Sequence, residues 1–284
     1  MFQIRLRLLL LLGCLALCLL SRSSAAVEPI RIGLTPTFLN ERHALIADWR
    51  AYLERKLKQP VKFVLRDSYQ ETLELLRQRS IDVAWLCDCP HVTGNPEFRL
   101  MATPVFQGRP FYRAYMIVPE GDTTTRSIVD LKNKVFAYTD PYSNVGYLFP
   151  RYELTKAGEN PDGYFRRTFF TRAQRKSVEA VAVGVADAAS VNSYIWETMN
   201  QQAPVLTGRT RVVTRSPEYG IPPFVAVRAF PAGLFRRLQQ ALFDMSADAA
   251  GREVLRKMNL DGFIKPDPDL YREVAEIVRF MNGQ

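Results

Sequence analysis

The sequence predicts an α/β protein with two lobes, and two features of the 284-residue chain support this prediction. Short apolar runs alternate with stretches whose apolar residues recur at helical spacing, the pattern of a parallel sheet covered by helices on both faces. This alternation is interrupted and then begins afresh near the middle of the chain. Extended stretches near residues 112–118 and 222–227 would cross twice between the lobes. We therefore expect a ligand cleft between them.

The first 26 residues are expected to form a signal peptide. Arg5 and Arg7 precede an almost wholly apolar run over 8–20, and small residues at 23–26 offer a cleavage site. The apolar run is short for a transmembrane helix. We therefore expect an exported, periplasmic protein.

The charge of the chain excludes one class of partner. Loss of Arg5, Arg7 and Arg22 with the signal peptide reduces the formal net charge from +9 to +6. The remaining basic residues are scattered without a tract, which argues against nucleic-acid binding. A mild positive field suits a small anionic ligand.

The first lobe is expected over residues 27–115 plus 226–284. Its elements in order are a strand at 30–34, a helix with apolar positions between 45 and 57, a strand at 61–65, a helix at 68–78 and a strand at 81–86. Ser68 is the expected N-cap of the second helix. Because ligands bind at the carboxyl ends of parallel strands, Thr35, Tyr69 and Cys87 are expected near the cleft.

The second lobe is expected over residues 116–225, after strands at 99–105 and 112–118. It should contain strands at 135–138, 168–170 and 188–191, with helices from Ser143, around 178–183, and through Trp196 and Met199. A strand at 224–227 then leads to three helices of the first lobe, at 234–245, 251–258 and 270–281.

Residues 139–153 are the most informative stretch for function. An apolar strand at 135–138 is followed by a turn and then by Ser143 and Asn144, which are residue types that favour a helix N-cap. The free N–H groups at such a helix start, together with the helix dipole, form an anion site. The alternative is an ordinary capped helix without a ligand.

Four stretches in order carry a resemblance to a known family: residues 31–36, 67–69, 81–86 and 140–150. The chain resembles the PhnD-like family of exported phosphate-, phosphite- and phosphonate-binding proteins that serve ABC importers. This resemblance implies a type II periplasmic binding protein fold, in which two lobes close over a tetrahedral oxyanion, as a monomer without a cofactor. It also implies that Ser143 and Asn144 bind the anion, with Tyr69 and Tyr112 donating from the other lobe. Together with Thr35 and Cys87 at the strand ends, and Val145 at the helix start, these residues form the expected ligand site.

Three departures from the family pattern bear on the ligand. Asn144 and Val145 stand where relatives usually have two hydroxyl residues, and Gln174 stands where they often have His. Tyr194 and Pro222 occupy positions that are acidic in binders of aminoalkylphosphonates. These differences disfavour a ligand with an ammonium group and favour a simple oxyanion.

The segment Cys87-Asp88-Cys89-Pro90-His91 ends the third strand at the expected cleft, and four interpretations remain open. The two thiols could be small buried side chains. They could recognise a thiophilic ligand such as arsenite, as in a family branch that resembles arsenite sensors. Cys87, Cys89 and His91 could instead bind a soft metal ion. A disulfide between Cys87 and Cys89 would be strained.

The sequence therefore leaves two functional classes, of which neither is an enzyme. One is a transport component that delivers an oxyanion to a membrane ABC permease. The other is a sensor that presents its ligand to a membrane histidine kinase. Catalysis is not expected, since His43 and His91 are the only histidines and the chain has no nucleophile elbow, Walker loop or His-Glu-x-x-His motif.

Overall fold

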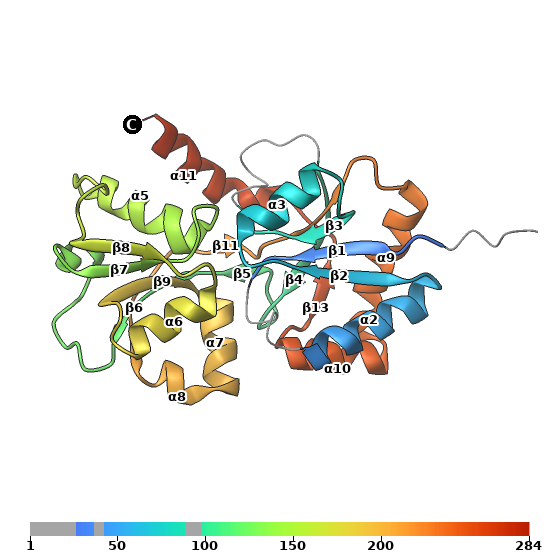
Figure 1. Cartoon of the computed structure of the whole chain (residues 1–284), viewed down its shortest axis with the longest axis horizontal. Coiled ribbons are helices and arrows are strands. Elements are labelled where there is room, and N and C mark those ends of the chain that lie inside the picture. The colour runs from blue at the N-terminus through green and yellow to red at the C-terminus, as the bar shows by residue number, and fades with distance from the viewer. Residues whose placement is uncertain (1–26, 37–42, 89–97, 284) are drawn as a thin grey trace, which may run out of the picture.

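The computed structural model describes residues 27–36, 43–88 and 98–283, which form two α/β lobes joined by a short pair of strands (Figure 1). The expected signal peptide lies outside the described residues, as do Cys89 and His91. In the part of the chain that is described, no helix combines the length and the apolar character needed to cross a membrane.

The first lobe is built on a mixed sheet of six strands. In spatial order these are β13 (Gly262–Ile264), β4 (Phe98–Val105), β12 (Phe224–Val227), β3 (Val83–Trp85), β1 (Ile30–Leu34) and β2 (Val61–Leu65). The first three strands along the chain are parallel, as the alternating pattern predicts, with β1 between its two neighbours. β12 returns from the second lobe and pairs antiparallel with β3 and β4.

Helices cover both faces of this sheet. They are α2 (His43–Leu57), α3 (Tyr69–Arg77), α9 (Ala232–Phe243) and α10 (Ala249–Met258), with a 3-10 turn at Asp244–Ser246. Trp49 of α2 is fully buried, and its ring centroid lies 4.8 Å from that of Phe63 and 5.8 Å from that of Phe224. The Tyr52 hydroxyl donates to the Ala241 carbonyl at 2.7 Å and so joins α2 to α9.

The second lobe is built on a sheet of five strands. Their spatial order is β10 (Thr210–Arg215), β6 (Ala114–Pro119), β9 (Ala188–Asn192), β7 (Val135–Tyr138) and β8 (Arg167–Phe170). The helices of this lobe are α5 (Phe149–Lys156), α6 (Gln174–Ala182), α7 (Ser193–Gln202) and α8 (Pro204–Thr207), with a 3-10 turn at Ile128–Leu131. β7, β8 and β9 are parallel, so the helix starts that follow them gather at one edge of the sheet.

Two short antiparallel strands connect the lobes: β5 (Phe111–Tyr112) and β11 (Tyr219–Gly220). A 3-10 turn at Pro268–Tyr271 packs beside β11, and a Cβ on Gly220 would stand 2.6 Å from a backbone oxygen of that turn. The last helix, α11 (Arg272–Asn282), then crosses to the second lobe and packs on α5 (Figure 1). The two lobes are thus held together at the hinge by three segments of chain.

The predicted helix after β7 has an unusual first turn. Residues Asn144–Leu148 form a π-helical turn that continues into α5. Pro150 lacks the N–H that would donate to the Gly146 carbonyl in an α-helix. Instead, the Thr139 N–H donates to this carbonyl at 3.0 Å and so joins the turn to the end of β7. π-Helical turns of this kind are frequent at functional sites.

Candidate functional site

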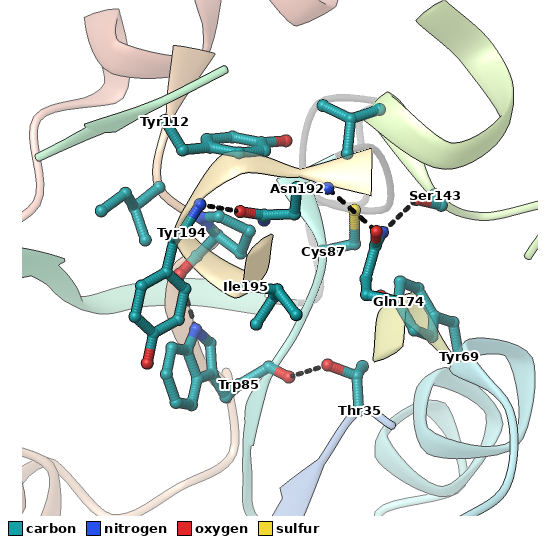
Figure 2. A pocket seen from close by; sticks show the side chains of 13 residues that line it. Thr35, Tyr69, Trp85, Cys87, Tyr112, Ser143, Gln174, Asn192, Tyr194 and Ile195 are labelled. Carbon is teal, nitrogen blue, oxygen red and sulfur yellow. Dashed lines mark hydrogen bonds between the residues drawn. The ribbon is translucent and has the colours of Figure 1, made fainter. Parts of the chain in front are cut away.

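A small cavity of about 30 Å³ lies between the lobes. It is lined by residues from both lobes and from the hinge: Thr35, Tyr69, Trp85, Cys87, Tyr112, Ser143, Val145, Gln174, Asn192, Tyr194, Ile195, Ile221 and Pro222 (Figure 2). Because the cavity is small and enclosed, the structure corresponds to the closed state of the two lobes, with space for one small molecule.

Four helices begin at this cavity. Tyr69 is the first residue of α3, Ser143 caps the π-helical turn, Gln174 is the first residue of α6, and Asn192 caps α7. The N–H groups of a first helical turn have no partners within the helix, and the helix dipole places partial positive charge there. Convergence of four such ends makes the cavity attractive to an anion.

The cavity contains no formal charge among the described residues that line it, because none of these is Lys, Arg, His, Asp or Glu. One side is polar and carries hydroxyl and amide groups, including those of Ser143 and Gln174, whereas the Thr35 hydroxyl donates to the Trp85 carbonyl at 3.1 Å (Figure 2). The other side is apolar and includes Trp85, Ile195 and other residues. An anion would therefore be held by dipoles and neutral donors rather than by a countercharge.

A chain of hydrogen bonds fixes the polar side. The Asn192 N–H donates to Gln174 Oε1 at 3.0 Å, and Gln174 Nε2 donates to Ser143 Oγ at 3.2 Å (Figure 2). Ser143 Oγ also accepts from the Gly146 N–H at 3.0 Å, as an N-cap. All three side chains are buried, so this geometry is held without competition from solvent.

A second buried network joins the lobes behind the cavity. The carboxylate of Asp88 accepts from the Tyr112 hydroxyl at 2.7 Å and from the Asn144 side-chain amide at 3.0 Å. It also accepts from the Cys87 thiol at 2.9 Å, and the Asn144 N–H points to the Cys87 sulfur at 3.5 Å. Burial raises the pKa of Asp88, although these donors act in the opposite direction. Asn144 therefore turns its side chain toward the other lobe.

Further contacts hold the lobes closed. Asp140, at the end of β7, accepts from the Tyr69 N–H at 3.2 Å and so caps α3 from the opposite lobe. Burial raises the pKa of Asp140 as well. The Tyr194 hydroxyl donates to the Met258 carbonyl of the first lobe at 2.7 Å.

Six of the seven residues that the sequence places in the ligand site line the cavity. Thr35, Tyr69, Cys87, Tyr112, Ser143 and Val145 line the cavity, whereas Asn144 lies behind it in the network of Asp88. The Tyr112 hydroxyl donates to Asp88, so this tyrosine presents its ring side to the cavity rather than a free donor.

Sequence reasoning passed over Asn192, and on the apolar side of the cavity it passed over Ile195 and Ile221. Asn192 ends β9 and begins α7, so the rule that ligands bind at the carboxyl ends of strands would have found it. Ile221 adjoins the hinge strand β11, and no local pattern marks it, whereas Pro222 was singled out only through the family resemblance.

Of the cysteine and histidine side chains on which the four interpretations of the segment 87–91 depend, only that of Cys87 lies among the described residues. Cys87 is buried and its thiol donates to Asp88 at 2.9 Å, while Cys89 and His91 lie outside the described residues. No group of three His, Cys, Asp or Glu side chains suited to a metal ion occurs within residues 27–36, 43–88 and 98–283.

Comparison with known proteins gives a consistent result. Residues 32–271 match the family model described as the periplasmic substrate-binding protein of a phosphonate ABC transporter. A curated relative, the probable ABC transporter phosphite-binding protein PhnD1 of Prochlorococcus marinus (strain MIT 9301), is 24% identical over 163 residues. That alignment covers 55% of each protein, so the chain matches about half the length of this relative.

Solved structures show the same fold. PhnD1 of Prochlorococcus marinus in complex with methylphosphonate has a TM-score of 0.78 at 22% identity, covering 90% of this chain and 98% of that one. The binding-protein component of a phosphonate ABC transporter from Pseudomonas aeruginosa has a TM-score of 0.81 at 21% identity, covering 89% and 86%. The predicted two-lobed fold is thereby confirmed, and the family match covers most of the chain. The protein belongs to the family of periplasmic substrate-binding proteins of phosphonate ABC transporters.

Proposed function

We propose that the protein captures a small phosphorus oxyanion, of the phosphite or methylphosphonate type, and delivers it to a membrane ABC permease. The observation that carries this proposal is the convergence of four helix starts on one enclosed cavity without charged lining residues among those described. Dipoles and N–H groups of fixed orientation can bind an anion there without a countercharge.

The two sides of the cavity support a ligand with two kinds of surface. Phosphite and methylphosphonate carry oxygens on one side and a hydrogen or methyl group on the other. The oxygens would face Ser143 and Gln174, and the apolar substituent would face Ile195 and its neighbours. The names of the similar proteins, which mention phosphite and methylphosphonate, support the same ligand class.

An aminoalkylphosphonate fits this cavity less well. An ammonium group buried without a negative partner is costly. No Asp or Glu is among the described residues that line the cavity, and the Tyr194 hydroxyl is already bonded to Met258.

Closure of the lobes would couple capture to delivery. The ligand would contact Thr35, Tyr69 and Cys87 in the first lobe and Ser143 and its neighbours in the second, so it stabilises the closed state over the open one. A permease is implied as partner by the family, and it would recognise the closed form. Nothing in the comparisons supports the alternative of a sensor for a histidine kinase.

A thermal-shift and calorimetric screen tests the proposal. The ligands are phosphite, methylphosphonate, phosphate, sulfate and arsenite, and the proteins are the wild type, Cys87→Ser and the double variant Cys87→Ser with Cys89→Ser. We expect phosphite or methylphosphonate to stabilise all three, by about 2.7 kcal/mol at a concentration 100-fold above Kd.

Two results would contradict the proposal. If arsenite stabilised the wild type but neither cysteine variant, the cavity would be a thiol site rather than an oxyanion site. If none of the phosphorus oxyanions stabilised the wild type, the helix starts would have another role.

A further inference from the structure

Gln174 occupies the cavity wall in a way that fixes the orientation of its amide. A backbone N–H can only donate, so the group that faces the Asn192 N–H at 3.0 Å must be the Gln174 carbonyl oxygen. The amide nitrogen must therefore face Ser143 Oγ, which it does at 3.2 Å. Gln174 is 2% exposed, so water cannot easily exchange for either partner.

The consequence lies at Ser143. A hydroxyl oxygen has two acceptor positions and one hydrogen to donate. Gly146 N–H and Gln174 Nε2 occupy the two acceptor positions. Within the described residues, no acceptor is found for the Ser143 hydroxyl hydrogen, and Ser143 lines the cavity. The remaining hydrogen-bonding capacity of this serine is a donor directed at whatever fills the cavity.

We propose that Gln174 is a positioning residue that makes the Ser143 hydroxyl an obligatory donor, and so requires an atom of the ligand that accepts a hydrogen bond at this position. This inference rests on the proposed oxyanion function and specifies how one oxygen of the ligand is held there. A ligand group that can only donate, such as an N–H, would leave the Ser143 hydroxyl hydrogen unbonded, which is costly in a buried site.

The amide also makes this control independent of pH. Gln does not titrate, whereas a histidine or carboxylic acid at the same position would change between donor and acceptor over the physiological range. Changes of affinity between pH 6 and 8 would then come from the ligand and from other groups rather than from the Gln174–Ser143 pair.

A double-mutant cycle measured by titration calorimetry with methylphosphonate at pH 8 tests the pairing. We expect Ser143→Ala to weaken binding about 10- to 100-fold, because it removes a hydrogen bond to a charged ligand. Gln174→Met should weaken binding about 10-fold in the wild type but less than about 3-fold in the Ser143→Ala background, because the Ser143 hydroxyl is absent there and only the hydrogen bonds of Gln174 with the Tyr69 side chain and the Asn192 N–H are left to lose. Gln239→Met is the matched control, since Gln239 donates to the Met101 carbonyl away from the cavity and is only partly buried.

A pH series on Gln174→Glu gives a second readout. The introduced carboxylate at pH 8 would accept the hydroxyl hydrogen of Ser143, so binding relative to the wild type should fall at least 100-fold. Acidification to pH 5 should recover part of that loss, because the protonated carboxyl can donate to Ser143 as the amide does. Because protonation of the ligand affects both proteins equally, the ratio of their affinities reports only the effect of the introduced side chain.

The outcomes separate this inference from the proposed function. The wild type could bind methylphosphonate while the double variant loses affinity by the product of the two single losses, within a factor of two. In that case Gln174 acts on the ligand directly and the positioning role is overturned. A pH-independent ratio for Gln174→Glu overturns it as well. If the wild type binds neither methylphosphonate nor phosphite, the proposed function fails and this inference fails with it.

Discussion

Replacement of Gly146 by alanine should damage both stability and ligand binding, because this glycine permits a close approach of backbone and side chain. A Cβ built at Gly146 would stand 2.3 Å from Thr139 Oγ1, 2.5 Å from Thr139 Cβ and 2.9 Å from Ser143 Oγ. These separations are on the order of 1 Å shorter than the usual contact of about 3.5 Å. Thr139 is fully buried and bonded to Ser177, so it has little freedom to move.

The expected cost follows from overpacking. Extra atoms in a well-packed core typically cost about 1–3 kcal/mol, and each kcal/mol lowers Tm by about 2–4 °C for a chain of 150–250 residues. Urea and thermal unfolding of Gly146→Ala measure this cost, and calorimetry measures the loss of methylphosphonate binding as Ser143 is displaced. Gly233→Ala is the control, since a Cβ at Gly233 in α9 would meet no atom within 4 Å. If Gly146→Ala matched this control within about 0.5 kcal/mol, the close packing of the turn would be refuted.

Three further substitutions test the contacts that close the lobes. Asp140→Ala removes the cap on the Tyr69 N–H and should weaken ligand binding about 10-fold, with a larger radius of gyration in solution scattering; an unchanged radius would argue against a closing role. For Asp88, burial raises the folded-state pKa above the unfolded value of about 3.9, so its contribution to stability is greatest below that pH and is lost as the pH rises through the folded pKa. Asp88→Asn should therefore lose less stability than the wild type between pH 4 and 7 in urea unfolding, and parallel pH profiles would contradict this. Tyr194→Phe deletes the donor to the Met258 carbonyl and should lower the free energy of unfolding by about 1 kcal/mol, while an unchanged unfolding midpoint would show that the contact is dispensable.

The parts of the fold that depend on local sequence could be predicted. The Ser68 cap of α3 is present, with its side chain accepting from the Glu71 N–H at 3.1 Å, and the strands at 30–34, 61–65 and 135–138 have their expected bounds. β10 and β13 were not predicted. Their polar or very short sequences pair with β6 and β4, strands distant in the sequence, so no local pattern reveals them.

In the candidate site too, features set by local sequence could be predicted and features set by distant contacts could not. Thr35 and Cys87 lie just beyond the ends of β1 and β3, and Tyr69 begins the helix that follows β2, so the position of strand ends was sufficient to bring them to the cavity. The side chain of Asn144 is turned away by Asp88, a partner 56 positions earlier in the chain. Spacing along the chain carries no information about that contact. The π-helical turn depends on the joint effect of Pro150 and the Thr139 N–H, which helix-capping rules do not anticipate.

The division of the cavity between the lobes suggests how a neutral site both holds and releases an anion. Three of the four helix starts, at Ser143, Gln174 and Asn192, belong to the second lobe, and only Tyr69 of α3 belongs to the first. Opening the lobes would withdraw Tyr69 from the ligand and break its bond to Asp140 in the same movement. Because the ligand and the interlobe bonds favour the same closed state, a permease that separates the lobes weakens both together. No change of charge in the site is then needed for release.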